Sequence, residues 1–201
     1  MPPLILFAHG AGAPSASAWM RAWSRRLGAL GVVESFDYPY MQAGRKTPDR
    51  HPALVAAHGA ALDQARARHG ERPVVLAGKS MGSRIGCHLA LERPGIAALV
   101  CFGYPLRSGS TGALRDQVLL ALRTPILFLQ GARDPLCPLE DLAAVRARMT
   151  APSELHVVEG GNHSLEVGKR ELAASGRTQD GEDQAVLAAV KGFLARHGVA
   201  A

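Results

Sequence analysis

The chain contains few cysteines and few aromatic residues, and each shortage excludes a class of protein. Only three of its 201 residues are cysteine, Cys87, Cys101 and Cys137. They are too few and too widely spaced for a disulfide framework or a zinc knuckle. Aromatic residues make up 5% of the chain, too few for a surface that stacks nucleic-acid bases. We therefore expect reduced thiols, no metal site and no nucleic-acid partner.

Long hydrophobic runs are also missing. No apolar run approaches the roughly 20 residues that a membrane-spanning helix needs. The first ten residues, MPPLILFAHG, lack the basic region of a signal peptide, and their apolar run is short and typical of a strand. These absences predict a protein without a membrane span that stays in the cytoplasm.

The net charge of +6 is not concentrated in a basic tract. Arginines are spread over nearly every segment, so the charge at most favours a substrate that is itself negative. One local cluster, formed by Arg45, Lys46 and Arg50, follows a predicted strand. It could bind a carboxylate or a phosphate, but a solvated loop is the simpler interpretation.

Short apolar runs alternate with segments of helical spacing. Most of these runs lack polar alternation, which is typical of parallel strands covered on both faces. Strand–helix alternation with short connections predicts a three-layer, doubly wound α/β fold with a mostly parallel sheet, in one domain over residues 1–201. Three segments fit neither pattern and are expected to be loops or short irregular helices: 41–52, 106–117 and 166–182. The predicted strands are 4–10, 32–39, 73–78, 97–105, 125–131 and 154–160.

The third predicted strand ends in the sequence Gly78-Lys79-Ser80-Met81-Gly82, which has the form G-x-S-x-G. A serine on a sharp strand-to-helix turn needs small residues two positions away on either side. The helix that follows points backbone N–H groups at any oxyanion that forms there. The bare pattern is a weak signal, because it would arise by chance in about one chain in eight of this composition. The strand before it and the helix after it are what support the interpretation.

A nucleophilic serine needs a base, and the base needs a carboxylate that orients it. On a sheet of this kind the partners follow the serine in the order acid, then histidine, each after a strand. Asp134 follows the fifth predicted strand and His163 the sixth. We predict that Ser80, Asp134 and His163 form a catalytic triad. The alternative is that Asp134 is an ordinary turn residue before Pro135 and that His163 lies in an ordinary loop.

An oxyanion hole requires two backbone N–H donors. One donor is expected to be Met81, the residue after the serine. The other is expected in the loop after the first strand, His9-Gly10-Ala11-Gly12-Ala13, where small residues allow close approach. We favour the N–H of Ala11, with Gly12 as the alternative, and we expect His9 to hold the loop in place.

These motifs resemble those of the α/β-hydrolases in type and in order, over essentially the whole chain. The stretch FDYPYMQAGR, residues 36–45, resembles small hydrolases near dienelactone hydrolase. Dienelactone hydrolases carry a cysteine nucleophile, whereas position 80 is serine, so their substrate does not transfer. The resemblance implies a serine hydrolase for a carboxylic ester or thioester, with no cofactor and no metal. An acyltransferase or peptidase would share the triad, and a binding or scaffold protein would use the fold without turnover.

The resemblance also has departures. The chain opens on the strand that usually comes third in this family, and residues 106–124 leave room for one short helix rather than a lid. An open, shallow site is therefore expected. Tyr38, Tyr40 and Tyr104 follow strands and are expected to line the pocket. Lys79 could pair with a carboxylate in solvent or favour an anionic substrate, and we favour the pair. Nothing in the sequence indicates the oligomeric state.

Overall fold

A computed structural model describes residues 1–199 of the chain and shows one sheet of six strands. All neighbouring strands are parallel, in the order β2-β1-β3-β4-β5-β6. Each predicted strand is present, and the doubly wound α/β fold is confirmed. The strands are β1 (Leu4–Ala8), β2 (Val32–Phe36), β3 (Val74–Lys79), β4 (Ile96–Phe102), β5 (Ile126–Gly131) and β6 (Ser153–Val158).

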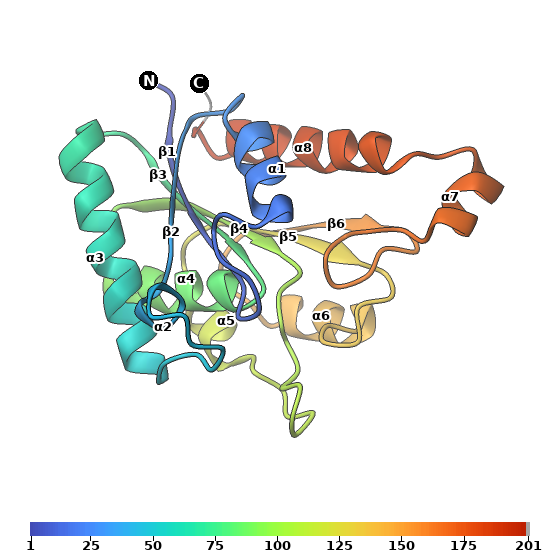
Figure 1. Ribbon diagram of the computed structural model, residues 1–201, viewed down its shortest axis with the longest axis horizontal. Coiled ribbons are helices and arrows are strands. Elements are labelled where there is room, and N and C mark those ends of the chain that lie inside the picture. Colours follow the sequence, from blue (N-terminus) through green and yellow to red (C-terminus); the bar gives the residue numbers. More distant parts are fainter. Residues whose placement is uncertain (200–201) are drawn as a thin grey trace.

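Helices cover both faces of this sheet (Figure 1). One face packs against α1 (Ala18–Leu27) and α8 (Gln179–Arg196). The other face is covered by a larger group of helices. Two short helices, α2 (Pro39–Gln42) and α7 (Lys169–Ser175), lie in connecting segments. The larger group comprises α3 (His51–His69), α4 (Met81–Glu92), α5 (Gln117–Ala121) and α6 (Leu139–Arg146).

The interior strand β1 shows why polar alternation is missing from the sequence. Leu4 and Leu6 belong to the core on the α3 and α4 side, whereas Ile5 and Phe7 pack toward α1 and α8. Every residue of β1 is buried. A strand enclosed between two helical layers has no solvent-facing side, so it contains apolar residues at successive positions.

The strand order reverses between β1 and β3. From β1 the chain moves outward to β2, and it then crosses back to β3 and continues to β6. In sheets of this kind, ligands bind at such a reversal, outside the carboxyl ends of the strands. Ser80 directly follows β3, and the loop that begins at His9 directly follows β1. The fold therefore places these two segments side by side.

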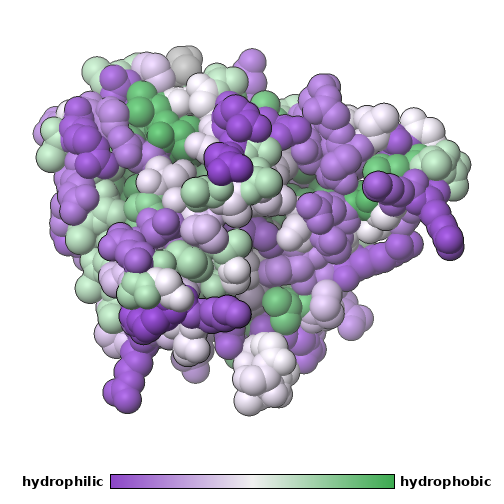
Figure 2. Space-filling view, viewed as in Figure 1, coloured by the Kyte–Doolittle hydropathy of each residue, from purple (hydrophilic) through white to green (hydrophobic). Residues whose placement is uncertain are grey.

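The segments without a clear pattern are short helices and loops, as expected. Residues 41–52 include the end of α2 and the start of α3, and residues 166–182 include α7 and the start of α8. The segment after β4 is mostly irregular, and it extends beyond the helical layer in Figure 1. On the face shown in Figure 2, hydrophilic and hydrophobic residues are interspersed. Over the described residues, no helix is both long and apolar enough to cross a bilayer.

Candidate active site

Ser80 occupies a strained turn between β3 and α4. Its backbone angles are φ 51° and ψ −113°, and positive φ is costly for a residue with a side chain. Two glycines allow this turn. A Cβ at Gly78 would overlap the backbone nitrogen of Ser83, and one at Gly82 would overlap the carbonyl oxygen of Ala8. The helix thus starts in direct contact with the strands, and this contact holds Ser80 in its strained conformation.

The structure brings the three predicted triad residues together from the ends of three strands. His163 Nε2 lies 2.8 Å from Ser80 Oγ, and His163 Nδ1 lies 2.7 Å from Asp134 Oδ2. A carboxylate can only accept, so Nδ1 carries the proton and Nε2 is free to accept the hydroxyl proton of Ser80. The side chain of Asp134 is fully buried, whereas that of His163 is 26% exposed. This is the geometry that activates a serine hydroxyl.

Asp134 is held as a carboxylate by several donors. Burial raises its pKa, but this effect is outweighed by hydrogen bonds from His163, from the Leu136 amide and from Gln130. The net result is a pKa below the ordinary value for aspartate. Gln130 was not among the residues predicted from the sequence. Its signal was one amide side chain within the otherwise apolar strand ILFLQG.

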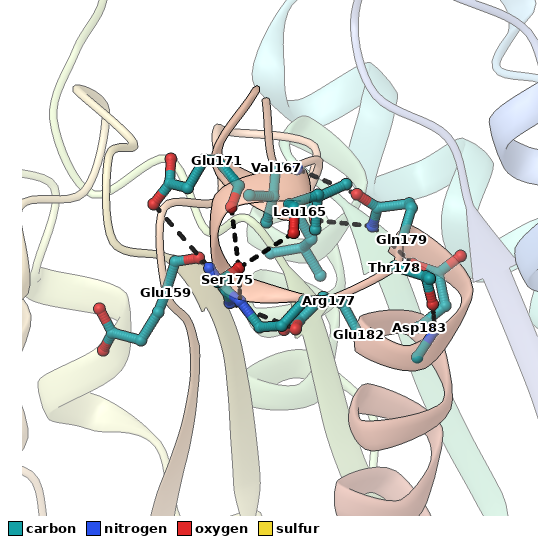
Figure 3. A network of polar contacts seen from close by, with 12 residues as sticks. Glu159, Leu165, Val167, Glu171, Ser175, Arg177, Thr178, Gln179, Glu182 and Asp183 are labelled. Carbon is teal, nitrogen blue, oxygen red and sulfur yellow. Dashed lines mark hydrogen bonds and ion pairs between the residues drawn. The ribbon is translucent and has the colours of Figure 1, made fainter. Parts of the chain in front are cut away.

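The loop that carries His163 is attached to the start of α8. Gln179 Nε2 donates to the carbonyl oxygen of Leu165 at 3.1 Å, and its Oε1 accepts from the Val167 amide at 3.0 Å (Figure 3). Leu165 is buried although its φ is 64°. Nearby, Arg177 forms an ion pair with Glu182 at 3.2 Å. The position of the imidazole therefore depends in part on contacts between its loop and the helix that follows it.

Lys79 also supports this loop, in a role that the sequence did not indicate. The expected carboxylate partner is not found: among the described residues none lies within 4.0 Å of its ammonium group. Lys79 Nζ instead donates to the carbonyl oxygen of His163 and lies 5.6 Å from the centre of the Trp19 ring. Burial lowers the pKa of Lys79 to about 8, although the charges of Asp134 and Glu166 oppose this shift.

The predicted oxyanion donors lie beside Ser80. The amides of Met81, Ala11 and Gly12 have no acceptor among the described residues. Ala11 is further positioned by Tyr40, whose hydroxyl donates to its carbonyl oxygen at 3.0 Å. Ala11 and Met81 line one hollow together with Ser80, and unpaired amides beside a serine hydroxyl can stabilise a developing oxyanion.

The three tyrosines expected to line the pocket lie in the core instead. Tyr38, Tyr40 and Tyr104 have no exposed surface, and none of them lines a hollow next to Ser80. Tyr40 supports the loop formed by residues 9–13, here called the oxyanion loop, through its hydrogen bond to Ala11. The expectation was wrong because a position after a strand does not determine whether a side chain turns toward solvent or into the layer below.

His9 holds its loop in place, as expected. Its imidazole Nε2 accepts a hydrogen bond from the Tyr38 amide at 3.1 Å, and the side chain is fully buried. Burial lowers the pKa of His9. Behind it, the Tyr38 hydroxyl lies 3.1 Å from His58 Nδ1, and His58 is also fully buried. Two neutral histidines and a tyrosine thus support the oxyanion loop from the protein interior.

This buried cluster predicts a loss of stability in acid. Burial lowers the pKa of His58 to about 3, so below pH ~6.5 the unfolded state binds a proton that the folded state does not. The contribution of neutral His58 to the free energy of unfolding is therefore complete above pH ~6.5. It is lost as the pH falls toward 3, at up to about 1.4 kcal/mol per pH unit. The free energy of unfolding, measured with urea at several pH values between 6 and 4, should change less steeply with pH in His58→Leu than in the wild type. Tyr38→Phe, which keeps the imidazole, should retain the wild-type slope, and equal slopes in wild type and His58→Leu would contradict the prediction.

Two hollows meet at Ser80. The first, here called the basic hollow, has a volume of ≈330 Å³, and its lining includes Arg84, Arg107, Arg115, His51, Met81 and Leu54. The second, the His163 hollow, has a volume of ≈410 Å³, and its lining includes Trp19, Met20, Lys79, His163, Ser164 and Glu166. Ala11, Ser80 and Leu136 line both. Arg45, Lys46 and Arg50 line neither, and Arg45 forms an ion pair with Asp49 at 2.6 Å.

Comparison with known proteins gives the same fold. A family model described as an alpha/beta hydrolase domain matches residues 2–195. Est1E from Butyrivibrio proteoclasticus superposes with a TM-score of 0.70 at 19% identity, covering 98% of this chain and 88% of Est1E. An alpha-beta serine hydrolase homologue from Coxiella burnetii gives 0.68 at 20% identity, covering 80% and 76%.

A third similar structure is a cold-adapted esterase from an Arctic intertidal metagenomic library. It has a TM-score of 0.65 at 21% identity, and the match covers 91% of this chain and 82% of the esterase. At these identities the structural likeness concerns the fold alone. The narrower resemblance to dienelactone hydrolases stays a prediction from the sequence. The family match, which spans nearly the whole chain, shows that this protein belongs to the α/β-hydrolase family.

Proposed function

We propose that this chain acts, as one domain, as a serine hydrolase that cleaves a carboxylic ester or thioester through an acyl-enzyme on Ser80. The observation that carries the proposal is the position of His163, whose two ring nitrogens lie 2.8 Å from Ser80 Oγ and 2.7 Å from Asp134 Oδ2. These three side chains are at least 29 positions apart in the sequence, and they converge there at one edge of the sheet.

The reaction follows from these contacts. Ser80 Oγ attacks the carbonyl carbon while its proton moves to His163 Nε2, and the carbonyl oxygen becomes an oxyanion held by the Met81 and Ala11 amides. When the intermediate collapses, His163 gives that proton to the leaving oxygen or sulfur. Water then attacks the acyl-enzyme with His163 again as base, and the acid and free Ser80 are released. Asp134 keeps the proton on Nδ1 throughout and stabilises the imidazolium.

A binding or scaffold protein on the same fold is the alternative. It would have no physical need for a strained serine beside two unpaired amides, because such strain costs about 1–3 kcal/mol and persists only where the surrounding structure maintains it. An acyltransferase or a peptidase would use the same groups. These activities are distinguished from ester hydrolysis by the acceptor and by the bond that is cut.

Labelling with a fluorophosphonate tests the proposal. The reagent should phosphonylate Ser80 stoichiometrically, as mass spectrometry of the peptide would show, and it should stop hydrolysis of phenyl butyrate at the same rate as it labels. Denatured protein, in which the triad is dispersed, serves as the control and should not react. Absence of both the adduct and any turnover would favour the scaffold alternative.

A further inference from the structure

The basic hollow contains positive charge that the protein does not neutralise. Of its three arginines, Arg107 is paired with Asp141, which accepts from both Nε and Nη2 of the guanidinium. Arg84 and Arg115 differ. Among the described residues no carboxylate lies within 4.0 Å of either guanidinium. Asp49 lines the same hollow, but its oxygens accept from Arg45 and from the Tyr40 amide.

Arg84 is the nearer of the two to the nucleophile along the chain. It follows Ser80 by four residues in α4, which places it one helical turn further on the same side. It is half-buried, and within residues 1–199 its side chain makes one polar contact, with His88 Nε2 at 3.4 Å. Burial lowers the pKa of Arg84, and the neighbouring charge of Arg115 adds to this effect. Two half-buried cations next to each other repel, and an anion between them would relieve that repulsion.

A histidine also borders the same space. His51 lines the basic hollow, and its Nε2 is buried without a hydrogen-bond partner among the described residues. Burial and the charge of Arg84 lower the pKa of His51, so the ring is neutral at pH 7. The ring therefore brings no positive charge to the hollow, and its Nε2 has no exposed surface from which to donate to an anion there. The charge that an anion would meet is that of Arg84 and Arg115.

The position of His163 decides which half of a substrate would enter this hollow. His163 must protonate the leaving atom, so the leaving group departs on its side, and it lines the other hollow together with Trp19 and Met20. The acyl half therefore extends the opposite way, past Met81 toward Arg84. Its space is limited, because ≈330 Å³ lies at the small end of small-molecule sites, which span roughly 300–1,000 Å³.

We propose that the acyl chain of the substrate ends in a carboxylate held by Arg84 and Arg115, so that the substrate is a monoester or monothioester of a short dicarboxylic acid. The planar guanidinium fork matches the two oxygens of a carboxylate. This inference rests on the proposed function for the chemistry at Ser80 and adds the class of acid that is released. It also gives a use to two arginines that have no carboxylate partner among the described residues.

Three phenyl esters test this inference. Monophenyl adipate carries the carboxylate on the acyl chain, 4-carboxyphenyl hexanoate carries it on the leaving group, and phenyl hexanoate carries none. We expect kcat/KM to be about 10- to 100-fold higher for monophenyl adipate than for phenyl hexanoate, the range expected for hydrogen bonds to a charged group. The preference should shrink as salt is added.

Two variants locate the effect. Arg84→Gln and Arg115→Gln should each reduce the preference for monophenyl adipate by about 10-fold. Arg25→Gln removes the same charge from an exposed position on α1 that lines neither hollow, and it should retain the preference. Arg115 lies in the irregular segment before α5, so its variant decides the question if Arg84→Gln does not fold.

Each outcome separates this inference from the proposed function. Turnover of phenyl hexanoate without a preference for monophenyl adipate, or a preference that both arginine variants keep, overturns the inference and leaves the hydrolase proposal intact. A preference for 4-carboxyphenyl hexanoate overturns the assignment of the acyl half. If no ester is cleaved, the hydrolase proposal fails, and NMR titration of Ser80→Ala with adipate still decides the binding site. If adipate binds and Arg84→Gln weakens its binding, the result supports the proposed site. Absence of adipate binding overturns it.

Discussion

Replacing Ser80 with alanine should lower kcat for phenyl butyrate by about 10⁴- to 10⁶-fold, the range seen when the nucleophile of a serine triad is removed. The hydroxyl is the atom that forms the acyl-enzyme, and no other serine lies within reach of His163 Nε2 among the described contacts. The residual rate would come from the Met81 and Ala11 amides acting on a bound ester attacked by water.

The fold should survive this change, because alanine keeps the Cβ at φ 51° and removes one oxygen. The far-UV spectrum and the urea midpoint measured in parallel with kcat distinguish a lost nucleophile from a lost fold. Ser35→Ala is the matched control, because Ser35 is exposed on the edge strand β2. Retention of more than a tenth of the wild-type rate in Ser80→Ala would contradict the proposed role of Ser80.

Asp134→Asn should lower kcat by about 10⁴-fold while the geometry around it is kept. The carboxylate accepts from His163 Nδ1 at 2.7 Å, which leaves Nε2 without a proton. An amide can donate to Nδ1 instead, and the ring proton then moves to Nε2, where it faces Ser80 and prevents Nε2 from accepting the hydroxyl proton. The imidazolium formed during attack also loses its negative partner.

Measurements of kcat on phenyl butyrate, together with a crystal structure of the variant, would check this prediction. Asp63→Asn is the control, because Asp63 is an exposed residue of α3 whose ion pair with Arg93 lies at the surface. A drop of less than about tenfold in Asp134→Asn would show that the tautomer of His163 is set by other contacts.

The four interior strands were predictable because burial on both faces leaves a largely apolar run, whereas the edge strands β2 and β6 are shorter apolar runs with polar residues. The parallel order then brings their carboxyl ends to one edge, so residues that follow different strands become neighbours. Ser80, Asp134 and His163 could be predicted together for this reason. Their separation along the chain does not matter once the sheet is formed.

Side-chain direction within the loops could not be predicted in the same way. Tyr38 and Tyr104 follow strands as His163 does, yet both turn into the core. Lys79 occupies a position next to the nucleophile, but its partner is a backbone carbonyl, and backbone groups leave no signal in a sequence. Arg84 did have a signal, because a residue four positions after Ser80 in a helix lies one turn away from it.

The attachment of the His163 loop to Gln179 bears on how the protein is made. Synthesis proceeds from the N-terminus, so β3 and its serine leave the ribosome long before α8 does. Until that helix docks, Leu165 and Val167 have no Gln179 to bind, and the His163 loop is held by Asp134 and Lys79 without its attachment to α8. A nascent chain would therefore react more slowly with the esters around it, and full reactivity would emerge only with the last helix.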